Sequence, residues 1–299
     1  MSADEGWSDA KPISQRFGLL RQKEKGFFSV RVKAVAGNCT APQLALLSEL
    51  ATRYGRGYLS LTTRLNLEIP WVKISDAPAV CAALAEVGLF TGSTGRNVRA
   101  IVSCKGTVCP HGLFDTQEIC RELDQVYYGK PLPAKFKIGI AGCPNNCTKV
   151  QFNDIGIMGQ QVPLFDTSDC TGCGACVVAC RAGALWLDED STLRYRQDLC
   201  LNCGACQGRC TSDAVRVLAE GVTLFIGGTA GRRVMAGLPF GPMVPLSLCS
   251  ALIDAVLTVY QKYGEPGERL RSMMGRVGSE LVLSTVREVV LDPSFKWGG

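Results

Sequence analysis

Two stretches, CTGCGACVVAC (residues 170–180) and CLNCGACQGRC (residues 200–210), repeat one cysteine pattern. Each reads C-x2-C-x2-C-x3-C. Three thiolates at this spacing on a tight loop can bind one face of a cubane iron–sulfur cluster, and the fourth ligand then comes from the other run. We therefore predict two [4Fe–4S] sites, the first with Cys170, Cys173, Cys176 and Cys210 as ligands, the second with Cys200, Cys203, Cys206 and Cys180.

The doubled pattern is that of a bacterial-type 2x[4Fe–4S] ferredoxin domain, which we predict as an insert over residues 162–215. Gly172, Gly174 and Gly204 fit the pattern because close approach to a cluster demands small residues. The proline that usually follows the fourth cysteine is replaced by Arg181 and Thr211. The alternative is a pair of structural zinc sites, which usually join two separated C-x2-C pairs.

Composition agrees with clustered metal ligands in a reducing compartment. The 299 residues include 16 cysteines and one histidine, which excludes a histidine-rich zinc or copper site. The net charge of +5 is spread along the chain without a basic run, so we expect no nucleic-acid partner. We also expect no membrane span and no secretory signal, because no apolar run is long enough and the N-terminus is acidic and polar. A cytoplasmic protein is predicted.

Outward from the insert toward the N-terminus, the sequence predicts an α+β unit of the split βαβ kind over residues 1–90. Alternating residues at 27–35 predict a strand, and those at 58–72 predict another. Helical spacing at 39–55 predicts a helix, with Thr40 as N-cap and Gly55 as stop. A second helix is expected from Asp76 to Gly88.

A second α/β unit is predicted over residues 91–161 and 216–299, on both sides of the insert. Its expected strands cover 98–103, 136–142, 154–159 and 222–228. Helices are expected near 116–129, over 246–264 and near 267–290. The strand-rich core is thus expected to stop at the cysteine runs and to resume after them.

Four more cysteines lie in loops that end predicted strands. They are Cys104 and Cys109 in SCKGTVCPHG and Cys143 and Cys147 in AGCPNNCTKV. Both loops could converge on a third [4Fe–4S] cluster. A structural zinc or four unrelated buried thiols are the alternatives.

GCPNNC followed by DIGIMG, with a cysteine pair upstream, resembles the sirohaem–[4Fe–4S] signature of the sulfite and nitrite reductase family. The resemblance implies that Cys147 also bridges to the sirohaem iron. It extends to LSLTTRLNLEI, GRNVRAI, LPAKFKIGI and FIGGTAGRR, in the family's order from about residue 25 to 290. In the family these segments contact the substrate or the sirohaem. Together with GCPNNC, they would supply the catalytic residues Arg64, Arg96, Lys135 and Lys137, and the cofactor-binding residues Thr62, Thr63, Arg64, Asn66, Asn97, Asn145, Gly227, Gly228, Arg232 and Arg233.

The resemblance implies a sulfite reductase half-repeat with an inserted ferredoxin domain, typical of dissimilatory sulfite reductase subunits and of the catalytic subunit of anaerobic sulfite reductase. Its cofactors would be sirohaem and three [4Fe–4S] clusters, and its activity the six-electron reduction of sulfite to sulfide. Two departures stand out. The first cysteine pair is C-x4-C where the family commonly has C-x5-C, and only one half-repeat is present. We therefore expect an identical or different subunit to supply the second half.

The cationic residues suit this chemistry. Arg64 and Arg96 offer permanently charged forks for an oxyanion, and Lys135 and Lys137 alternate on a strand, so both face one side and can deliver protons. Without the resemblance, solvated lysines on an exposed strand face, and a surface ion pair for Arg64, would be the preferred explanations. His111 is left outside the catalytic set, and Cys39, Cys81, Cys120 and Cys249 are assigned no chemistry.

Two other functions stay open at the level of sequence. Nitrite reduction to ammonia demands nearly the same residues. A pure electron-transfer subunit without functional sirohaem would be expected to lack the anion-binding residues, which are present. No flavin or nicotinamide fingerprint occurs, because FIGGTAGRR lacks the G-x-G-x-x-G register. We therefore expect electrons from a donor subunit or a soluble ferredoxin.

Overall fold

The computed structural model describes residues 18–291. The chain forms two compact units, each built from separate segments. The first comprises Met1–Val102, Ile119–Ile138 and Val259–Gly278, and the second comprises Ser103–Glu118, Gly139–Thr258 and Ser279–Gly299. This division follows spatial contacts, and the three-part division expected from the sequence stays a prediction.

The first unit contains a five-stranded antiparallel sheet. Its strands are β1 (Leu19–Arg21), β2 (Phe27–Lys33), β3 (Ser60–Leu61), β4 (Leu67–Lys73) and β5 (Phe90–Thr91). The order is β1-β2-β4-β3, with β5 also paired to β2. Because β4 is antiparallel to both of its neighbours, β2 and β3 run parallel with β4 between them. The predicted split βαβ arrangement is confirmed.

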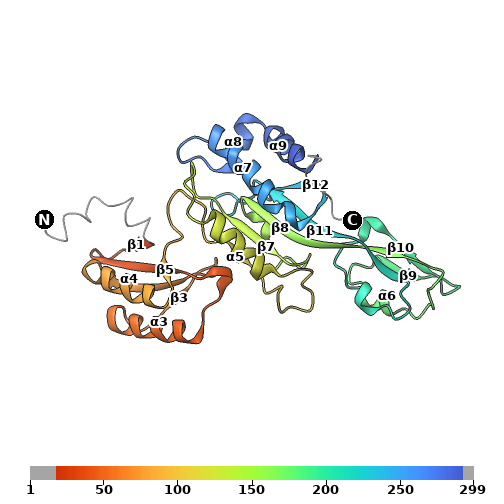
Figure 1. Cartoon of the computed structure of the whole chain (residues 1–299), viewed down its shortest axis with the longest axis horizontal. Helices are drawn as coiled ribbons and strands as arrows, with labels where there is room; N and C mark the ends of the chain where they lie inside the picture. Colours follow the sequence, from red (N-terminus) through yellow and green to blue (C-terminus); the bar gives the residue numbers. More distant parts are fainter. Residues whose placement is uncertain (1–17, 292–299) are drawn as a thin grey trace. The chain divides into compact units, whose positions relative to one another are not determined.

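Two helices, α3 (Ala41–Tyr54) and α4 (Ala77–Glu86), cover the same face of this sheet (Figure 1). Thr40 caps α3 as predicted, because its side chain accepts a bond from Gln43 N and the Gln43 side chain accepts one from Thr40 N. Gly55 ends the helix. Leu47 and Leu84 pack with strand residues such as Ile69 in a fully buried core.

One predicted strand of this unit is interrupted. The sequence predicted a strand over 58–72, but β3 and β4 are separated by a tight loop at 62–66. Thr62 N donates to Asn66 O at 2.9 Å, and Leu65 has a positive φ of 58°. The alternation of side chains continues through this loop, which is why the pattern concealed it. The loop matters because it carries Arg64.

A second five-stranded sheet has the order β12-β11-β8-β7-β6. Its strands are β6 (Val102–Ser103), β7 (Ile138–Ala141), β8 (Ile155–Phe165), β11 (Val215–Ile226) and β12 (Leu238–Val244). The predicted strand at 98–103 is regular only at its last two residues, although Val98 forms an isolated bridge with Phe136. Strand β12 was not predicted. Every residue of β7 is buried, and this strand leads directly to Cys143.

The remaining long helices are α5 (Thr116–Tyr127), α7 (Cys249–Tyr263), α8 (Leu270–Val277) and α9 (Ser279–Leu291). The helices expected near 116–129 and over 246–264 are confirmed. The expected helix near 267–290 is instead two helices, separated at Gly278, whose φ is 93°. No helix within residues 18–291 combines the length and the hydropathy that crossing a membrane requires.

Both cysteine runs lie at the end of a long two-stranded ribbon. Strands β8 and β11 pair from Ile155–Ile226 to Phe165–Val215, with one register shift (Figure 1). The pairing thus includes residues 162–165, which were expected within the insert. At the end of the ribbon are the short helix α6 (Ala175–Ala179) and a hairpin of β9 (Leu185–Leu187) and β10 (Leu193–Tyr195).

Candidate cofactor and anion sites

Cys104, Cys109, Cys143 and Cys147 lie on two loops that hydrogen bonds join. Cys104 N donates to Ile140 O at 3.1 Å, and Gly142 N donates to Cys104 Sγ at 3.2 Å. Leu113 N donates to Gly142 O at 3.0 Å. Burial raises the pKa of the Cys143 thiol, a bond from the Asn145 backbone lowers it, and the thiols of the other three cysteines raise it further. The fold therefore brings the four thiols together.

Three of the four cysteines predicted for the first site of the insert, Cys170, Cys176 and Cys210, lie near one another. Burial raises the pKa of Cys176, and the neighbouring thiols of Cys170 and Cys210 also raise it, although backbone bonds oppose them. Cys210 belongs to the second run, so the two runs exchange a residue here. Burial acts to raise the pKa of Cys210, but bonds from Ser212 and nearby backbone groups outweigh it and lower that pKa.

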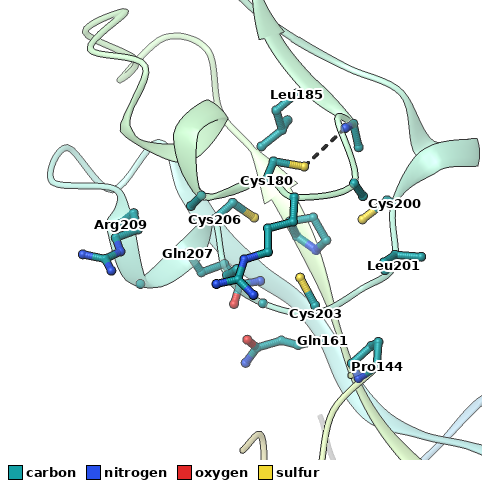
Figure 2. Close-up of a pocket in the computed structure, with 18 of the residues that line it drawn as sticks. Pro144, Gln161, Cys180, Leu185, Cys200, Leu201, Cys203, Cys206, Gln207 and Arg209 are labelled. Atoms are coloured by element: carbon teal, nitrogen blue, oxygen red, sulfur yellow. Dashed lines mark hydrogen bonds between the residues drawn. The ribbon is translucent and has the colours of Figure 1, made fainter. Parts of the chain in front are cut away.

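The second site surrounds a cavity of about 980 Å³. Figure 2 labels Cys180, Cys200, Cys203 and Cys206 among the residues that line this cavity. Burial raises the pKa of Cys206 to about 12, and the thiols of Cys203 and Cys200 also raise it. Ala184 N donates to Cys180 Sγ at 3.3 Å. Cys180 is the residue that the first run contributes.

The second site shares its cavity with the loops of the first cysteine group. Pro144, Asn145 and Cys143 line the cavity, as does the exposed His111. The second run is fixed to β8 by a bond from Gln161 N to Asn202 O at 2.8 Å. Gly204 lies beside the Gln161 side chain, and its φ of 70° is in the left-handed region that favours glycine. The insert therefore presents its second site, through one cavity, to Cys143.

No three His, Cys, Asp or Glu side chains within residues 18–291 converge as ligands of a single metal ion. A cubane requires a wider arrangement, because its four thiolates bind four different irons. Sulfurs spaced around an open cavity fit that demand.

A second pocket, of about 640 Å³, lies within the first unit and is cationic. Seven of the residues predicted from the sequence line it: Thr62, Thr63, Arg64, Asn66, Arg96, Lys135 and Lys137. Arg31, Arg99 and Arg269 also line it and were not predicted. None of its described lining residues is acidic. A pocket of this volume and charge suits a polyanionic ligand.

The loop between β3 and β4 positions Arg64. Thr62 Oγ1 accepts a bond from Asn66 N at 3.0 Å, and Asn66 Oδ1 accepts one from Ala34 N at 3.3 Å. The Arg64 guanidinium donates to Ala100 O at 2.9 Å and to Ile138 O at 3.2 Å. These carbonyls hold the side chain at the pocket wall. Lys135 and Lys137 flank Phe136, which is fully buried, so both lysines face the pocket as predicted.

Ser93 organises two of the arginines that were not predicted. Its carbonyl accepts bonds from Arg31 Nη1 at 3.3 Å and from Arg99 Nη1, and its φ is 59°. Ser93 N donates to the Tyr128 hydroxyl at 2.7 Å, which fixes this strained residue. Arg31 also forms an ion pair with Glu68 at 2.7 Å.

Arg99 contributes a cation whose hydrogen-bond donors are only partly paired. Burial lowers its pKa to about 10, and Arg31 contributes to this lowering, so Arg99 is still charged at neutral pH. Its Nε atom and the Oγ1 atom of Thr94 are buried without a hydrogen-bond partner among the described residues. Buried donors in this state indicate a missing acceptor. The pocket therefore fits an anionic group.

Six predicted cofactor residues do not line this pocket. Asn97 is adjacent to it in sequence, and its Oδ1 atom is buried without a described partner. Asn145 lines the cavity of the second cysteine site. Gly227, Gly228, Arg232 and Arg233 belong to the second unit. There, backbone bonds between Thr229 and Met235 close a hairpin loop on which both arginines are exposed.

Comparison with known proteins places these sites in context. The family model for the nitrite and sulphite reductase 4Fe-4S domain matches residues 94–292. That for the nitrite/sulfite reductase ferredoxin-like half domain matches residues 20–87. The chain is also similar to a solved dissimilatory sulfite reductase, with a TM-score of 0.72 and 20% identity over 91% of this chain and 74% of that one. At this identity the likeness shows the fold.

Two relatives are named as sulfite reductases. The coenzyme F420-dependent sulfite reductase of Methanocaldococcus jannaschii is 35% identical over 92% of this chain and 44% of its own length. One of the subunits of the anaerobic sulfite reductase of Salmonella typhimurium is 34% identical over 53% of this chain and 51% of its own length. The chain thus spans about half the length of these relatives.

Proposed function

This chain belongs to the nitrite and sulphite reductase family, and we propose that it is the catalytic subunit of a sirohaem-dependent sulfite reductase. The reaction would be the six-electron reduction of sulfite to sulfide. The observation that carries this proposal is the cationic pocket of the first unit, whose lining combines Arg64, Arg96, Lys135 and Lys137 without an acidic residue among those described.

The donor sets fit the cofactors of the proposal. Twelve cysteines in three groups would bind three [4Fe–4S] clusters, and Cys147, which is exposed, would also help to hold sirohaem. The buried, unpartnered Arg99 Nε supports an anionic ligand such as a sirohaem carboxylate. The residues proposed to hold sirohaem are Thr62, Thr63, Arg64, Asn66, Asn97, Asn145, Gly227, Gly228, Arg232 and Arg233. When bound, sirohaem and its cluster would supply electrons to the sulfur of sulfite.

The side chains of the pocket would bind and protonate the substrate. Arg64 is held by two carbonyl acceptors, so its guanidinium would bind an oxyanion in a fixed orientation. Arg96 is exposed and would add a second permanent charge. The Nζ atoms of Lys135 and Lys137 would donate the protons with which the departing oxygens leave as water.

The remaining assignments complete the proposal. Residues 1–90 would form the ferredoxin-like half-domain, 91–161 and 216–299 the sirohaem domain, and 162–215 an inserted 2x[4Fe–4S] ferredoxin domain. The insert would receive electrons from a donor subunit or a soluble ferredoxin. A second subunit, identical or different, would supply the other half-repeat. A cytoplasmic location is proposed from the cysteine usage.

Nitrite reduction to ammonia is the first alternative, because the family model that matches this chain includes nitrite reductases as well as sulfite reductases. Nitrite is also a small oxyanion and would be bound by the same cations. An electron-transfer subunit without sirohaem is the other alternative.

Anaerobic purification of the full chain, with iron and sirohaem quantified, tests the proposal. We expect about thirteen irons per chain, twelve from three cubanes and one from sirohaem, together with a Soret band from sirohaem. Reduced viologen should then support faster turnover of sulfite than of nitrite. A faster rate with nitrite would support the first alternative. A preparation with about eight irons and no Soret band would identify an electron-transfer protein.

A further inference from the structure

One tyrosine supports the turn from which the cationic pocket of the first unit is built. Tyr128 directly follows α5, and its hydroxyl accepts the bond from Ser93 N at 2.7 Å. Lys33 Nζ lies over the ring of Tyr128, 3.8 Å from the centroid. Gly92 leaves room for the hydroxyl, because a Cβ atom at that position would overlap it. Tyr128 does not itself line the pocket, so any effect on a ligand would pass through the residues that it contacts.

Ser93 has a backbone conformation that residues other than glycine rarely adopt, with a φ of 59°. Two bonds fix it, since Ser93 N donates to Tyr128 and Ser93 Oγ accepts from Ala100 N at 3.1 Å. Ser93 is only 4% exposed, so the loss of the phenol would leave a buried N–H group unpaired. The orientation of the Ser93 carbonyl therefore depends on the Tyr128 hydroxyl.

The Ser93 carbonyl holds two like charges together. It accepts bonds from Arg31 Nη1 at 3.3 Å and from Arg99 Nη1. Arg31 is also paired with Glu68. Among the described residues, by contrast, the Ser93 carbonyl is the only hydrogen-bond acceptor of Arg99. Burial and the charge of Arg31 both lower the pKa of Arg99, so this guanidinium is held where its charge is costly.

The same turn leaves two polar atoms beside the pocket without a partner. Arg99 Nε and Thr94 Oγ1 are buried with no hydrogen-bond partner among the described residues, and both residues line the pocket. Thr94 directly follows Ser93 and is 3% exposed. Buried polar groups are nearly always paired, so two such atoms at one cavity indicate an acceptor that belongs to a ligand. A carboxylate can accept from both a guanidinium and a hydroxyl group.

Given the proposed function, in which this pocket binds sirohaem, we propose that Tyr128 is a positioning residue for the cofactor. Its hydroxyl fixes the Ser93 turn, so that Arg99 Nε and the Thr94 hydroxyl are presented to carboxylates of the macrocycle. Donors that are fixed before binding lose little freedom when the ligand arrives. The phenol therefore increases the affinity for a ligand that it does not touch.

The test is a titration of the full chain, produced without sirohaem and kept free of oxygen. The probe is sirohydrochlorin, the iron-free macrocycle with the same carboxylates, whose visible absorbance reports binding. Tyr128→Phe keeps the ring beside Lys33 and removes only the hydroxyl. We expect its dissociation constant to rise by about threefold to tenfold. Tyr58→Phe is the control, because it loses a hydroxyl bonded to Trp71 in the same unit and should bind as the wild type does.

Two further variants separate positioning from a general loss of structure. Arg99→Met should weaken binding by about tenfold or more. Adding Tyr128→Phe to it should then change the dissociation constant by less than about twofold, because the phenol acts through Arg99. Thr94→Val replaces the unpaired hydroxyl with a methyl group of similar size. Its free energy of unfolding in urea should be unchanged or higher, yet its dissociation constant should rise by about threefold or more.

Several results would overturn the inference. Wild-type affinity in Tyr128→Phe or in Thr94→Val would do so, and so would additive effects of Tyr128→Phe and Arg99→Met. Unfolding of Tyr128→Phe in the absence of ligand would assign Tyr128 to stability instead. A wild-type chain that binds no sirohydrochlorin would contradict the proposed function as well, which distinguishes that failure from the others.

Discussion

Lys33 and Asp124 form an ion pair in which Nζ lies 2.5 Å from Oδ2, although 91 residues separate them in the sequence. Their side chains are only 14% and 5% exposed. The ammonium group also lies 3.8 Å from the centroid of the Tyr128 ring. Tyr128 in turn accepts the bond from Ser93 N. The pair thus connects β2 to α5. Through Tyr128 it also supports the turn at Ser93, whose carbonyl accepts bonds from Arg31 and Arg99.

Removing the charge of Asp124 should destabilise the protein strongly. In Asp124→Asn, Lys33 stays buried without its counter-charge, and breaking a buried pair in this way costs about 3–5 kcal/mol. Urea unfolding of the full chain measures the loss. Glu24→Gln is the control, because Glu24 lies 3.6 Å from Arg56 and both are more than half exposed. It should change the free energy of unfolding by less than about 1 kcal/mol. Equal effects of the two variants would contradict this account.

Lys137→Met should reduce sulfite turnover by about 100-fold or more, because it removes a proposed proton donor while keeping the length of the side chain. The rate with reduced viologen at saturating sulfite is the measurement. Lys262→Met removes the same charge from the last turn of α7, where Lys262 does not line the pocket, and should retain activity. A Lys137→Met enzyme with wild-type kcat would exclude this lysine from proton delivery.

Cys203→Ser should lower the iron content by about four per chain, because Cys203 is a proposed ligand of one cubane. Cys81→Ser should retain all the iron, since Cys81 lies on α4 of the first unit and belongs to none of the three cysteine groups. Iron assay of both variants, purified without oxygen, tests the ligand assignment. Equal iron in the two would refute it for Cys203.

The thiol of Cys249 should make stability depend on alkaline pH. Burial raises its pKa to about 12, above the ordinary value of 9.0. Between these values the unfolded chain releases the proton and the folded chain keeps it. The contribution of this thiol to the free energy of unfolding is therefore fully present below pH 9 and is lost as the pH rises toward 12.

The size of this effect is at most about 1.4 kcal/mol per pH unit. Cys249→Ala removes it, so its free energy of unfolding should fall less than that of the wild type between about pH 8 and pH 10.5. Denaturant titrations at both pH values give the comparison. Parallel losses in the two proteins would show that Cys249 is not the source.

Local signals in the sequence predicted the regular elements well. Thr40 and Gly55 mark the ends of α3 because capping depends on neighbouring residues, and these bounds are confirmed. Strand β12 was missed because its sequence, LPFGPMV, contains proline and glycine, which are depleted in strands. It forms because pairing with β11 supplies its backbone bonds.

The site was predicted only where a motif carried it. Arg31 occupies a polar position in the alternating strand FFSVRVK, which predicts nothing more than a face of the sheet. Arg269 immediately precedes α8, far along the chain. Both line the cationic pocket because of long-range packing, and no local sequence pattern could have predicted that placement. The polar positions of strands next to a suspected anion site were the one available signal.

The ribbon of β8 and β11 has a consequence for engineering. Asp166 N donates to Ala214 O at 2.8 Å, directly beyond the last paired residues of the ribbon. The two ends of the intervening segment are therefore already at hairpin distance. Residues 167–213 could be exchanged for a short reverse turn, or for another small domain, without moving the register of either strand. The ribbon is therefore a suitable position for domain exchange.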